Sequence, residues 1–542
     1  MVMFPRLGYR PVEGLSHNSK PFSAEADRVD AQQAGTDRVG AARGGATMSV
    51  HGQILRRCLL GPMRVATVDD QRSWRAGEIA LGAMNLAARL ERVNHSKTLG
   101  VMLPTSTAFP IAALAGWMLG RVIVPLNYLL KEDELNYVIR HCRCDTIVST
   151  GALLDHLKFE PTGARIIKLE DLSLGGFPEP RSWARANDDD LAALLYTSGT
   201  SGRPKGVMLT HGNLAANVRQ IQEWVSFTQR DMLFGVLPQF HSFGFTVMTL
   251  LPLMVGCKVV YSARFVPGRI VKKLREHRPT ALVAIASMYN ALLHVKNAGP
   301  DDFASLRLLV SGGEPLPKAL RDRFIERFGK EIYEGYGLTE TSPVTNWRRP
   351  GEAQFGSVGM ALPGIDERIV DLETGRDVGP NRDGEVRLKG PNIMKGYFRD
   401  PAATREAFDE QGYFRTGDIG RLDPAGHLAI TGRQKEMIIV GGENVFPREI
   451  EDALNKHESV RVSGVIGLPD PMRGEEPVAF VEINDGCAFD PASLRAWCRS
   501  QIAAYKTPKR IYQLDELPKG STGKVLRREL AKLAPALDGK EK

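Results

Sequence analysis

Long apolar runs are absent from this chain of 542 residues. Its most apolar stretch, Phe243 to Val255, is shorter than the roughly 20 residues that cross a bilayer, and Pro252 interrupts it. Residues 1–47 lack the apolar core of a signal peptide and show little periodicity, so we expect them to be disordered, with Met48 as a candidate start. The composition, 43% apolar and 25% charged, is typical of a soluble globular protein.

Zinc-type cysteine spacing is also missing, because the six cysteines are scattered along the chain. The cluster His141-Cys142-Arg143-Cys144 is a weak metal signal and favours the end of a helix that leads into a strand over 145–149. This cysteine usage predicts a reduced, cytoplasmic compartment.

A concentrated basic stripe interleaved with aromatic residues is absent too, which argues against nucleic-acid binding. The net charge is nevertheless +8. Residues 1–47 and 436–542 are nearly balanced, so the surplus belongs to the middle of the chain. A polyanionic nucleotide, coenzyme A or transient contact with an anionic lipid surface, such as the inner membrane surface, would suit such a charge.

The order of elements predicts several packed units, since 542 residues exceed one core. Short buried strands alternate with helices over 97–149 and again over 191–310, which indicates two parallel sheets covered by helices on both faces. From about Gly356, short alternating segments predict a small antiparallel barrel, with strands at Tyr413–Arg415 and Ile419–Leu422. We therefore predict an α/β protein with an N-terminal domain over 48–434 (the barrel at about 356–432) and an α+β lid domain over 435–542.

The most informative motif runs from Tyr196 to Gly206 and follows a buried strand at 191–195. Its hydroxyls and bare backbone N–H groups suit the oxygens of a triphosphate. The candidate ligands are Thr197, Ser198, Gly199, Thr200, Ser201, Gly202 and Lys205. An ordinary P-loop is excluded, because Arg203 and Pro204 separate Gly202 from Lys205 and no Ser or Thr follows that lysine.

Two further motifs follow strand positions. Gly313, Glu314 and Pro315 lie after a buried strand at 306–310, where open α/β sheets bind ligands. The run 333–341 offers an aromatic face at Tyr336 and places Thr339 beside Glu340, an oxygen pair that suits a hard cation. The same run contributes Glu334, Gly335 and Gly337.

Three charged residues near the end of the chain complete the pattern. Asp418 can accept the two hydrogen bonds of a diol, and Arg433 provides a fork-shaped donor for ribose or phosphate. Lys524 lies on a Gly/Ser/Thr arm before an amphipathic helix, where an ammonium can be delivered to developing negative charge.

The segment 238–244, Pro-Gln-Phe-His-Ser-Phe-Gly, contains no Asp that would hold a substrate ammonium, and its neighbours are apolar. An uncharged acid with an apolar tail is therefore expected. His241 on its own more often indicates a packed core histidine.

These motifs, in this order over residues 55–535, resemble the adenylate-forming superfamily and most resemble its fatty acyl-CoA synthetase branch. The resemblance implies ATP, Mg²⁺ and coenzyme A, and a medium- or long-chain fatty acid as substrate. It implies that Glu340 contacts magnesium, Asp418 the ribose, and that the run 333–341 holds AMP. It also implies that Lys524 is the catalytic lysine, that His241 gates the acyl pocket, that Lys435 is the lid hinge and that Gly442 meets the pantetheine channel.

Three alternatives stay open. A fatty acyl-AMP ligase would transfer its product to a carrier protein and usually carries an insertion before the hinge, which is not evident between Gly356 and Lys435. An aryl-CoA ligase would share every nucleotide motif. A catalytically inactive nucleotide-binding regulator would retain the fold, although intact Glu340, Asp418 and Lys524 argue against it.

Overall fold

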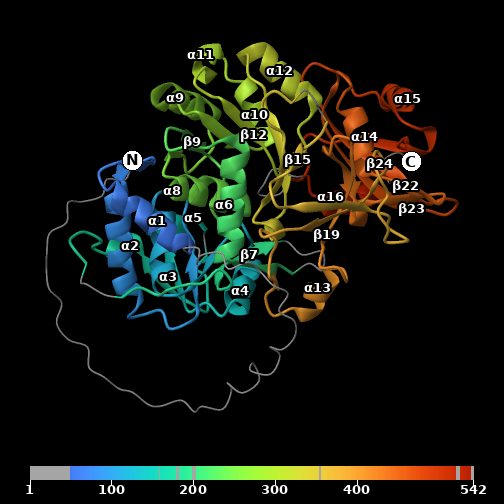
Figure 1. Cartoon of the computed structure of the whole chain (residues 1–542). Coiled ribbons are helices and arrows are strands. Elements are labelled where there is room, and N and C mark those ends of the chain that lie inside the picture. The colour runs from blue at the N-terminus through green and yellow to red at the C-terminus, as the bar shows by residue number, and fades with distance from the viewer. Residues whose placement is uncertain are drawn as a thin grey trace. The chain divides into compact units, whose positions relative to one another are not determined.

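The computed structural model describes residues 49–157, 159–178, 182–197, 203–352, 356–519 and 525–538 (Figure 1). The chain divides into two units, residues 1–47 and residues 48–542, and all described residues belong to the second. The expected disorder of residues 1–47 therefore lies outside the described residues, as do 198–202 of the phosphate motif and Lys524.

The larger parallel unit is a nine-stranded sheet in the order β15-β14-β13-β12-β11-β9-β10-β1-β2. Strands β1, β10, β9, β11, β12 and β13 run parallel, and antiparallel strands complete both edges. The bounds are β1 Val65–Val68, β2 Ser73–Arg75, β9 Met232–Gly235, β10 Lys258–Tyr261, β11 Ala281–Ala284, β12 Leu308–Ser311, β13 Tyr333–Gly337, β14 Val344–Trp347 and β15 Met360–Ala361.

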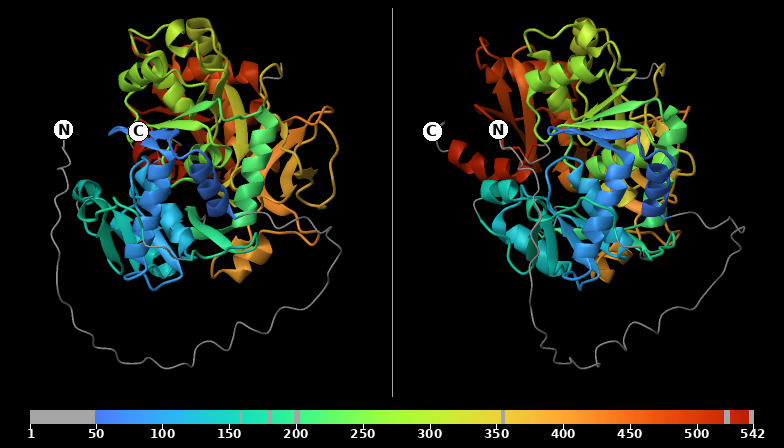
Figure 2. Two further views of the ribbon diagram at one scale, coloured as in Figure 1. Left: turned by 60° about the vertical axis from the view of Figure 1, so that its left-hand side comes forward. Right: turned by 90° about the vertical axis from the view of Figure 1, so that its left-hand side faces the viewer.

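Four helices gather around this sheet in Figure 1 and in both views of Figure 2, namely α9 Pro267–His277, α10 Ala286–Leu293, α11 Pro300–Phe303 and α12 Lys318–Phe328. They bury one aromatic core against the sheet. Phe324 is fully buried and meets Phe303 edge to face at 5.4 Å and Tyr289 at 5.5 Å. Such edge-to-face pairs add specificity to the simple burial of area.

The second parallel unit is a seven-stranded sheet in the order β18-β8-β7-β4-β3-β5-β6. Its bounds are β3 Thr98–Val101, β4 Val122–Pro125, β5 Thr146–Ser149, β6 Arg165–Lys168, β7 Leu191–Thr197, β8 Lys205–Thr210 and β18 Gly396–Tyr397. The helices that belong to this part are α1 Val50–Leu60, α2 Ala76–Leu90, α3 Ala108–Met118, α4 Glu132–His141 and α5 Gly151–Leu157. The first turn of α4 carries three acidic residues and its last turn carries Arg140 and His141, which complements the helix dipole.

Helix α6 (His211–Val225) connects the two parallel units, since it follows β8 and leads to β9 (Figures 1 and 2). Thr210 begins it with a reciprocal cap: its hydroxyl accepts from the Asn213 amide, and the Asn213 side chain accepts from the Thr210 amide, both at 3.0 Å. Asn217 and Trp224 then donate to backbone carbonyls of β14 at 2.7 and 2.8 Å. These bonds attach the helix to β14, the neighbour of the edge strand β15 in the nine-stranded sheet.

The expected antiparallel unit is a four-stranded sheet of β16 Asp366–Val370, β17 Gly384–Lys389, β19 Phe414–Leu422 and β20 Leu428–Arg433. The two short strands expected at Tyr413–Arg415 and Ile419–Leu422 are instead one strand of nine residues. Gly417 lies between them with φ of +68°, a conformation that favours glycine, and the pairing register shifts between Ile419 and Gly420. The glycine thus bends a continuous strand and does not end it.

The C-terminal part contains a five-stranded sheet of β21 Ile438–Val440, β22 Glu443–Val445, β23 Val460–Asp470, β24 Gly474–Ile483 and β25 Arg510–Gln513. Helices α13 Pro401–Glu406, α14 Pro447–Leu454, α15 Pro491–Gln501 and α16 Arg527–Asp538 complete the fold. The mixture of parallel sheets, an antiparallel sheet and an α+β C-terminal part confirms the predicted fold class.

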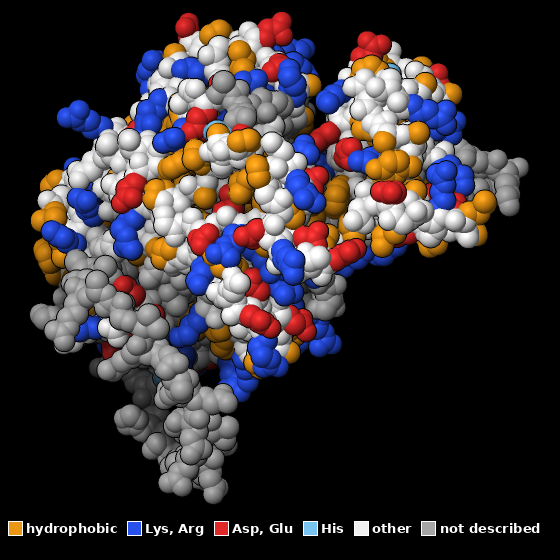
Figure 3. Space-filling view, turned by 45° about the vertical axis from the view of Figure 1, so that its right-hand side comes forward, with side chains coloured by type: hydrophobic (Ala, Val, Ile, Leu, Met, Phe, Trp, Pro, Cys, Tyr) orange, Lys and Arg blue, Asp and Glu red, His pale blue; other side chains and the backbone are white. Residues whose placement is uncertain are grey.

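No helix among the described residues is both long and apolar enough to cross a membrane. All six cysteines have free thiols, and all but Cys487 are buried. On the face in Figure 3, basic and acidic side chains are interspersed with apolar ones over most of the described surface.

Candidate active site

The phosphate motif is held by the antiparallel hairpin of β7 and β8. Thr197 pairs with Lys205 and Tyr196 with Gly206, so the two ends of the motif face each other. A side chain at position 206 would begin 3.1 Å from the Tyr196 ring, which explains the glycine. Ser198, Gly199, Thr200, Ser201 and Gly202 lie outside the described residues.

Glu340 lies in the turn η3 (Thr339–Thr341), where three separate elements meet. The Tyr397 hydroxyl donates to Glu340 Oε1 at 2.9 Å, and the Lys205 ammonium lies 5.0 Å from the centre of the Tyr397 ring. The hydroxyls of Ser242 and Thr339 are 3.2 Å apart. The structure therefore brings the predicted residues Lys205, Thr339 and Glu340 into one neighbourhood.

Burial raises the pKa of Glu340, while the hydrogen bond from Tyr397 and the charge of Arg433 oppose that rise. A buried carboxylate of this kind gains stability from a nearby cation. No group of three or more acidic, histidine or cysteine side chains among the described residues forms a complete metal cage. Glu340 could supply one carboxylate to magnesium, which is usually held by one or two carboxylates together with substrate phosphates.

A second polar group joins three strands. The Tyr336 hydroxyl (β13) donates to Asp418 Oδ2 at 2.6 Å, and Arg433 Nε lies 2.7 Å from Asp418 Oδ1. Asp418 and Arg433 are direct partners in the pairing of β19 with β20. The Asp418 side chain is buried, whereas 47% of the Arg433 side chain is exposed. The predicted ribose and adenine residues are thus neighbours in space, although 82 residues separate Tyr336 from Asp418.

The loop after β12 approaches the same strands. Gly313 has φ of +83° with open space where a side chain would begin, and a side chain at Gly312 would begin 3.0 Å from the Phe243 ring. Gly337 is crowded in another way, because a Cβ there would lie 1.8 Å from the carbonyl oxygen of Pro343. Close backbone packing therefore dictates Gly337, whereas Gly313 leaves the backbone accessible to a flat ligand.

Two predicted ligands in this region bond to the protein itself. Glu314 accepts a hydrogen bond from the Ser287 amide at 2.6 Å and so caps the N-terminus of α10. Glu334 is buried and accepts from the Leu316 amide at 3.2 Å, which attaches the loop to β13. Burial raises the pKa of both carboxyls. Pro315 is exposed beside them, and Gly335 lies within β13.

His241 begins the segment of α7 (Ser242–Phe245), the π-helical turn η2 (Thr246–Leu250) and α8 (Leu251–Val255). Its Nε2 atom is buried and has no hydrogen-bond partner among the described residues. Burial lowers the pKa of His241 to about 4, so the imidazole is neutral near pH 7. π-Helical turns recur at functional sites. An uncharged imidazole of this kind can bind a substrate oxygen without adding charge to its apolar surroundings.

The lid residues lie in short turns. Lys435 is exposed within η4 (Gln434–Glu436), and Gly442 forms the turn between β21 and β22 together with Gly441. Both glycines have positive φ, +62° and +88°, as a two-residue hairpin turn requires. An open hollow of about 530 Å³ adjoins this turn and is lined by Val440, Gly441, Glu443, Arg473 and Tyr505.

Sequence reasoning missed Tyr397 and Ser242. Tyr397 lies in the short strand β18, which joins the seven-stranded sheet only through β8. No charge or spacing pattern marks it, because its proximity to Glu340 and Lys205 follows from that pairing alone. Ser242 lies next to His241 inside the segment 238–244, so its place in that segment was the available signal.

Known protein families with a matching sequence agree with this arrangement of residues. The family described as AMP-binding enzyme matches residues 56–398, and its companion, the AMP-binding enzyme C-terminal domain, matches residues 449–524. The chain therefore belongs to the AMP-binding enzymes, the adenylate-forming superfamily. Within it, the protein is an AMP-forming CoA ligase, and such ligases use ATP with Mg²⁺ and coenzyme A.

Several relatives match most of the chain. The long-chain-fatty-acid–CoA ligase of Bacillus subtilis is 32% identical over 505 residues, covering 84% of this chain and 89% of the relative. The feruloyl-CoA synthase of an Amycolatopsis species is 32% identical over 487 residues, covering 88% and 97%. The solved structure of o-succinylbenzoate coenzyme A synthetase from Bacillus subtilis, in complex with ATP and magnesium, superposes with a TM-score of 0.79 at 28% identity, covering 88% and 99%.

Proposed function

We propose that this CoA ligase activates a medium- or long-chain fatty acid. The observation that carries the proposal is the composition of the segment beside the site. No residue from Pro238 to Cys257 carries an acidic or basic side chain, apart from the neutral His241. This segment reaches the nucleotide motif through Ser242, which contacts Thr339, and through Phe243, which packs against Gly312. An apolar acyl tail suits such uncharged surroundings better than a charged one.

The proposed reaction has two steps. A carboxylate oxygen of the acid attacks the α-phosphorus of ATP, the bond to the bridging oxygen breaks, and pyrophosphate leaves. The thiol of coenzyme A then attacks the acyl carbonyl, loses its proton, and AMP leaves. The products are an acyl-CoA, AMP and pyrophosphate.

Each site residue receives a role in this scheme. The motif from Thr197 to Lys205 would hold the leaving phosphates, and Glu340 the magnesium that accompanies ATP. Tyr336, Asp418 and Arg433 would hold the nucleoside, supported by the 2.6 Å hydrogen bond from Tyr336 to Asp418 and the 2.7 Å ion pair of Asp418 with Arg433. Lys524 would stabilise the charge that develops during adenylate formation.

We further propose a division into an N-terminal domain over 48–434 and a lid over 435–542, with Lys435 as the hinge. Rotation of the lid would withdraw Lys524 after the first step and bring Gly442 to the thiol channel. The free thiols favour action in the cytoplasm.

An aryl acid is the second candidate, because the feruloyl-CoA synthase is as similar in sequence as the fatty-acid ligase. Pyrophosphate release measured with octanoate, palmitate, ferulate and benzoate, with and without coenzyme A, separates the candidates. The proposal requires a preference of at least tenfold in kcat/KM for the fatty acids and thioester formation with coenzyme A. A preference for ferulate or benzoate would indicate an aryl-CoA ligase. Adenylate without thioester would indicate transfer to a carrier protein, and no turnover with any acid would indicate a regulator.

A further inference from the structure

The end of helix α1 exposes large apolar side chains side by side. Leu59, Leu60 and Met63 are 62%, 71% and 67% exposed, although they lie within five residues of one another. Arg56 lies one turn earlier on the same helix, and Arg75 contacts Met63, with its Nη1 atom 3.8 Å from the sulfur. We call these five residues the α1 tip. Solvent-exposed apolar side chains that gather in this way mark interaction surfaces.

The α1 tip is also strongly basic. No acidic residue occurs between Val50 and Val68, whereas Arg56, Arg57 and Arg64 all lie in that stretch. The acid nearest in sequence to Arg75 on α2 is Glu78, whose carboxylate already accepts bonds from Arg72 at 2.7 Å and from the Arg75 amide at 2.6 Å. Along the stretch 50–68 the exposed apolar side chains are therefore accompanied by arginines and by no acidic residue, which favours an anionic partner.

The helix under the α1 tip is firmly anchored. Arg57 Nε donates to the Met254 carbonyl at 3.1 Å, and Arg64 Nη1 donates to the Gly256 carbonyl at 2.6 Å, both at the end of α8. The opposite face of α1 is buried through Val50, Ile54 and Cys58. The exposed leucines therefore cannot turn into the core, because the other face of the helix already occupies it.

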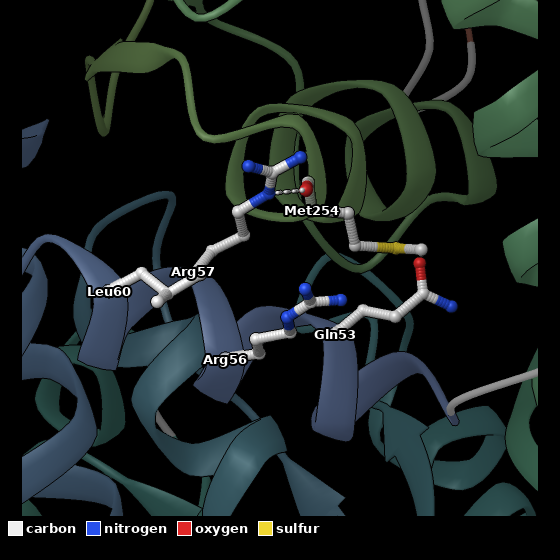
Figure 4. A pocket seen from close by; sticks show the side chains of 5 residues that line it. All are labelled: Gln53, Arg56, Arg57, Leu60 and Met254. Carbon is white, nitrogen blue, oxygen red and sulfur yellow. Dashed lines mark hydrogen bonds between the residues drawn. The ribbon is translucent and has the colours of Figure 1, made fainter.

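A small hollow adjoins the α1 tip. It has a volume of about 160 Å³ and is lined by Gln53, Arg56, Arg57, Leu60 and Met254. Figure 4 shows Arg57 bound to the Met254 carbonyl, while the side chains of Arg56 and Gln53 border the same space. Guanidinium groups bind phosphate oxygens in a fork geometry, so the hollow suits a phosphate-bearing headgroup.

We propose that the α1 tip docks on the surface of an anionic phospholipid bilayer. Leu59, Leu60 and Met63 enter the boundary between headgroups and acyl chains, and Arg56 and Arg75 contact lipid phosphates. A second copy of the chain is disfavoured on this surface, because a symmetric contact would bring like charges together. Residues 1–47 are disfavoured too, since their six basic and five acidic residues give the segment no net negative charge. The docking does not depend on which acid the enzyme activates.

Flotation of the full chain with vesicles tests this docking. Vesicles of phosphatidylcholine with 30 mol% phosphatidylglycerol should bind the protein, pure phosphatidylcholine should bind it at least tenfold more weakly, and high salt should weaken the binding. The double variant Arg56→Gln/Arg75→Gln should lose about fivefold in vesicle affinity for each guanidinium removed. The triple variant Leu59→Ser/Leu60→Ser/Met63→Ser should lose tenfold or more.

Matched controls separate the α1 tip from general effects of exposed residues. Phe177 and Met472 are 94% and 93% exposed, so Phe177→Ser/Met472→Ser removes apolar groups elsewhere. Arg528 and Lys532 are 75% and 64% exposed, so Arg528→Gln/Lys532→Gln removes the same charge elsewhere. Both controls should bind as the unmodified protein does, and all variants should keep its melting temperature.

The inference is overturned if the full chain fails to float with anionic vesicles, or if the α1-tip variants bind like the controls. It is also overturned if the variants change only the sedimentation coefficient, which would indicate a contact between copies. Pyrophosphate release with a dispersed acid should be the same in all variants. Loss of vesicle binding is therefore distinguishable from failure of the proposed activity.

Discussion

The Tyr336 hydroxyl donates a 2.6 Å hydrogen bond to Asp418 Oδ2, and this bond joins strand β13 of the nine-stranded sheet to strand β19 of the antiparallel sheet. Asp418 also lies 2.7 Å from Arg433 Nε. The nucleoside half of the proposed site therefore depends on a contact between two separate sheets.

Asp418→Ala is predicted to raise the KM for ATP by about 10- to 100-fold, the cost of losing charge-assisted hydrogen bonds to the ribose. The KM for the acid should change less than threefold. Steady-state pyrophosphate release with each substrate varied in turn measures both. Tyr336→Phe is the matched control, because it removes the bond to Asp418 and keeps the ring. Equal increases for ATP and acid in Asp418→Ala would contradict the ribose role.

Tyr397→Phe tests the state of Glu340. Burial raises the pKa of Glu340, and the 2.9 Å bond from Tyr397 opposes that rise. Without the hydroxyl the pKa rises further, so the carboxylate binds a proton at higher pH and the acidic limb of the pH–rate profile should move up by about one unit. Profiles of pyrophosphate release from pH 5 to 8 measure the shift. Tyr413→Phe removes a bond to Asp366 on the antiparallel sheet and should leave the limb in place. If the acidic limb stayed in place in Tyr397→Phe, we would conclude that protonation of Glu340 does not control the rate.

Lys524 and Lys435 test the alternation of the lid. Lys524→Ala should slow adenylate formation by two or more decades, the effect of removing one electrostatic stabiliser. Given pre-formed acyl-adenylate and coenzyme A, the same variant should form thioester near the normal rate. Lys435→Pro restricts the backbone at the proposed hinge, so it should spare the first step and impair the second. Rapid-quench kinetics measure the rate of each step separately. Equal slowing of both steps by either variant would argue against alternation of the lid.

His211 is predicted to make stability depend on pH. Burial, together with the neighbouring His51 ring at 5.5 Å, lowers its pKa from the ordinary 6.5 to about 4. Above pH 6.5 both folded and unfolded forms are neutral at this position, so its contribution is complete. Between pH 6.5 and 4 only the unfolded form binds the proton, so up to about 3 kcal/mol of stability is lost as the pH falls.

Melting temperatures from pH 7 to 4.5 check this dependence. His211→Phe should reduce the fall in melting temperature across that range, whatever its stability at pH 7. The exposed His294 supplies the control, and His294→Phe should show the unmodified slope. An unchanged slope in His211→Phe would mean that another group determines the acid sensitivity.

Much of this molecule follows from sequence, because local patterns determine local elements. The predicted alternation of strands and helices over 97–149 is present in the structure, with helices at Ala108–Met118 and Glu132–His141. The proximity of Asp418 to Arg433 follows from short antiparallel strands fifteen residues apart. Tyr397 could not be predicted in the same way, because only the pairing of its two-residue strand with β8 brings it close to Glu340 and Lys205. Glu314 was predicted to bind the ligand, but its carboxylate accepts a hydrogen bond from the N-terminus of α10 instead. No local sequence signal reveals this contact.

The π-helical turn η2 separates two parts of the acyl-side segment that have different attachments. The N-terminal part, from His241, meets the nucleotide motif, while α8 is fastened to α1 by Arg57. A π-turn holds one residue more than an α-helical turn, and loss or gain of a residue there rotates one part relative to the other. If this segment contacts the acid, as we propose, natural variation in it would alter which acid is accepted while the strands of the proposed nucleotide site stay fixed. Proteins with this fold could then come to accept different acids while they keep the same ATP-binding strands.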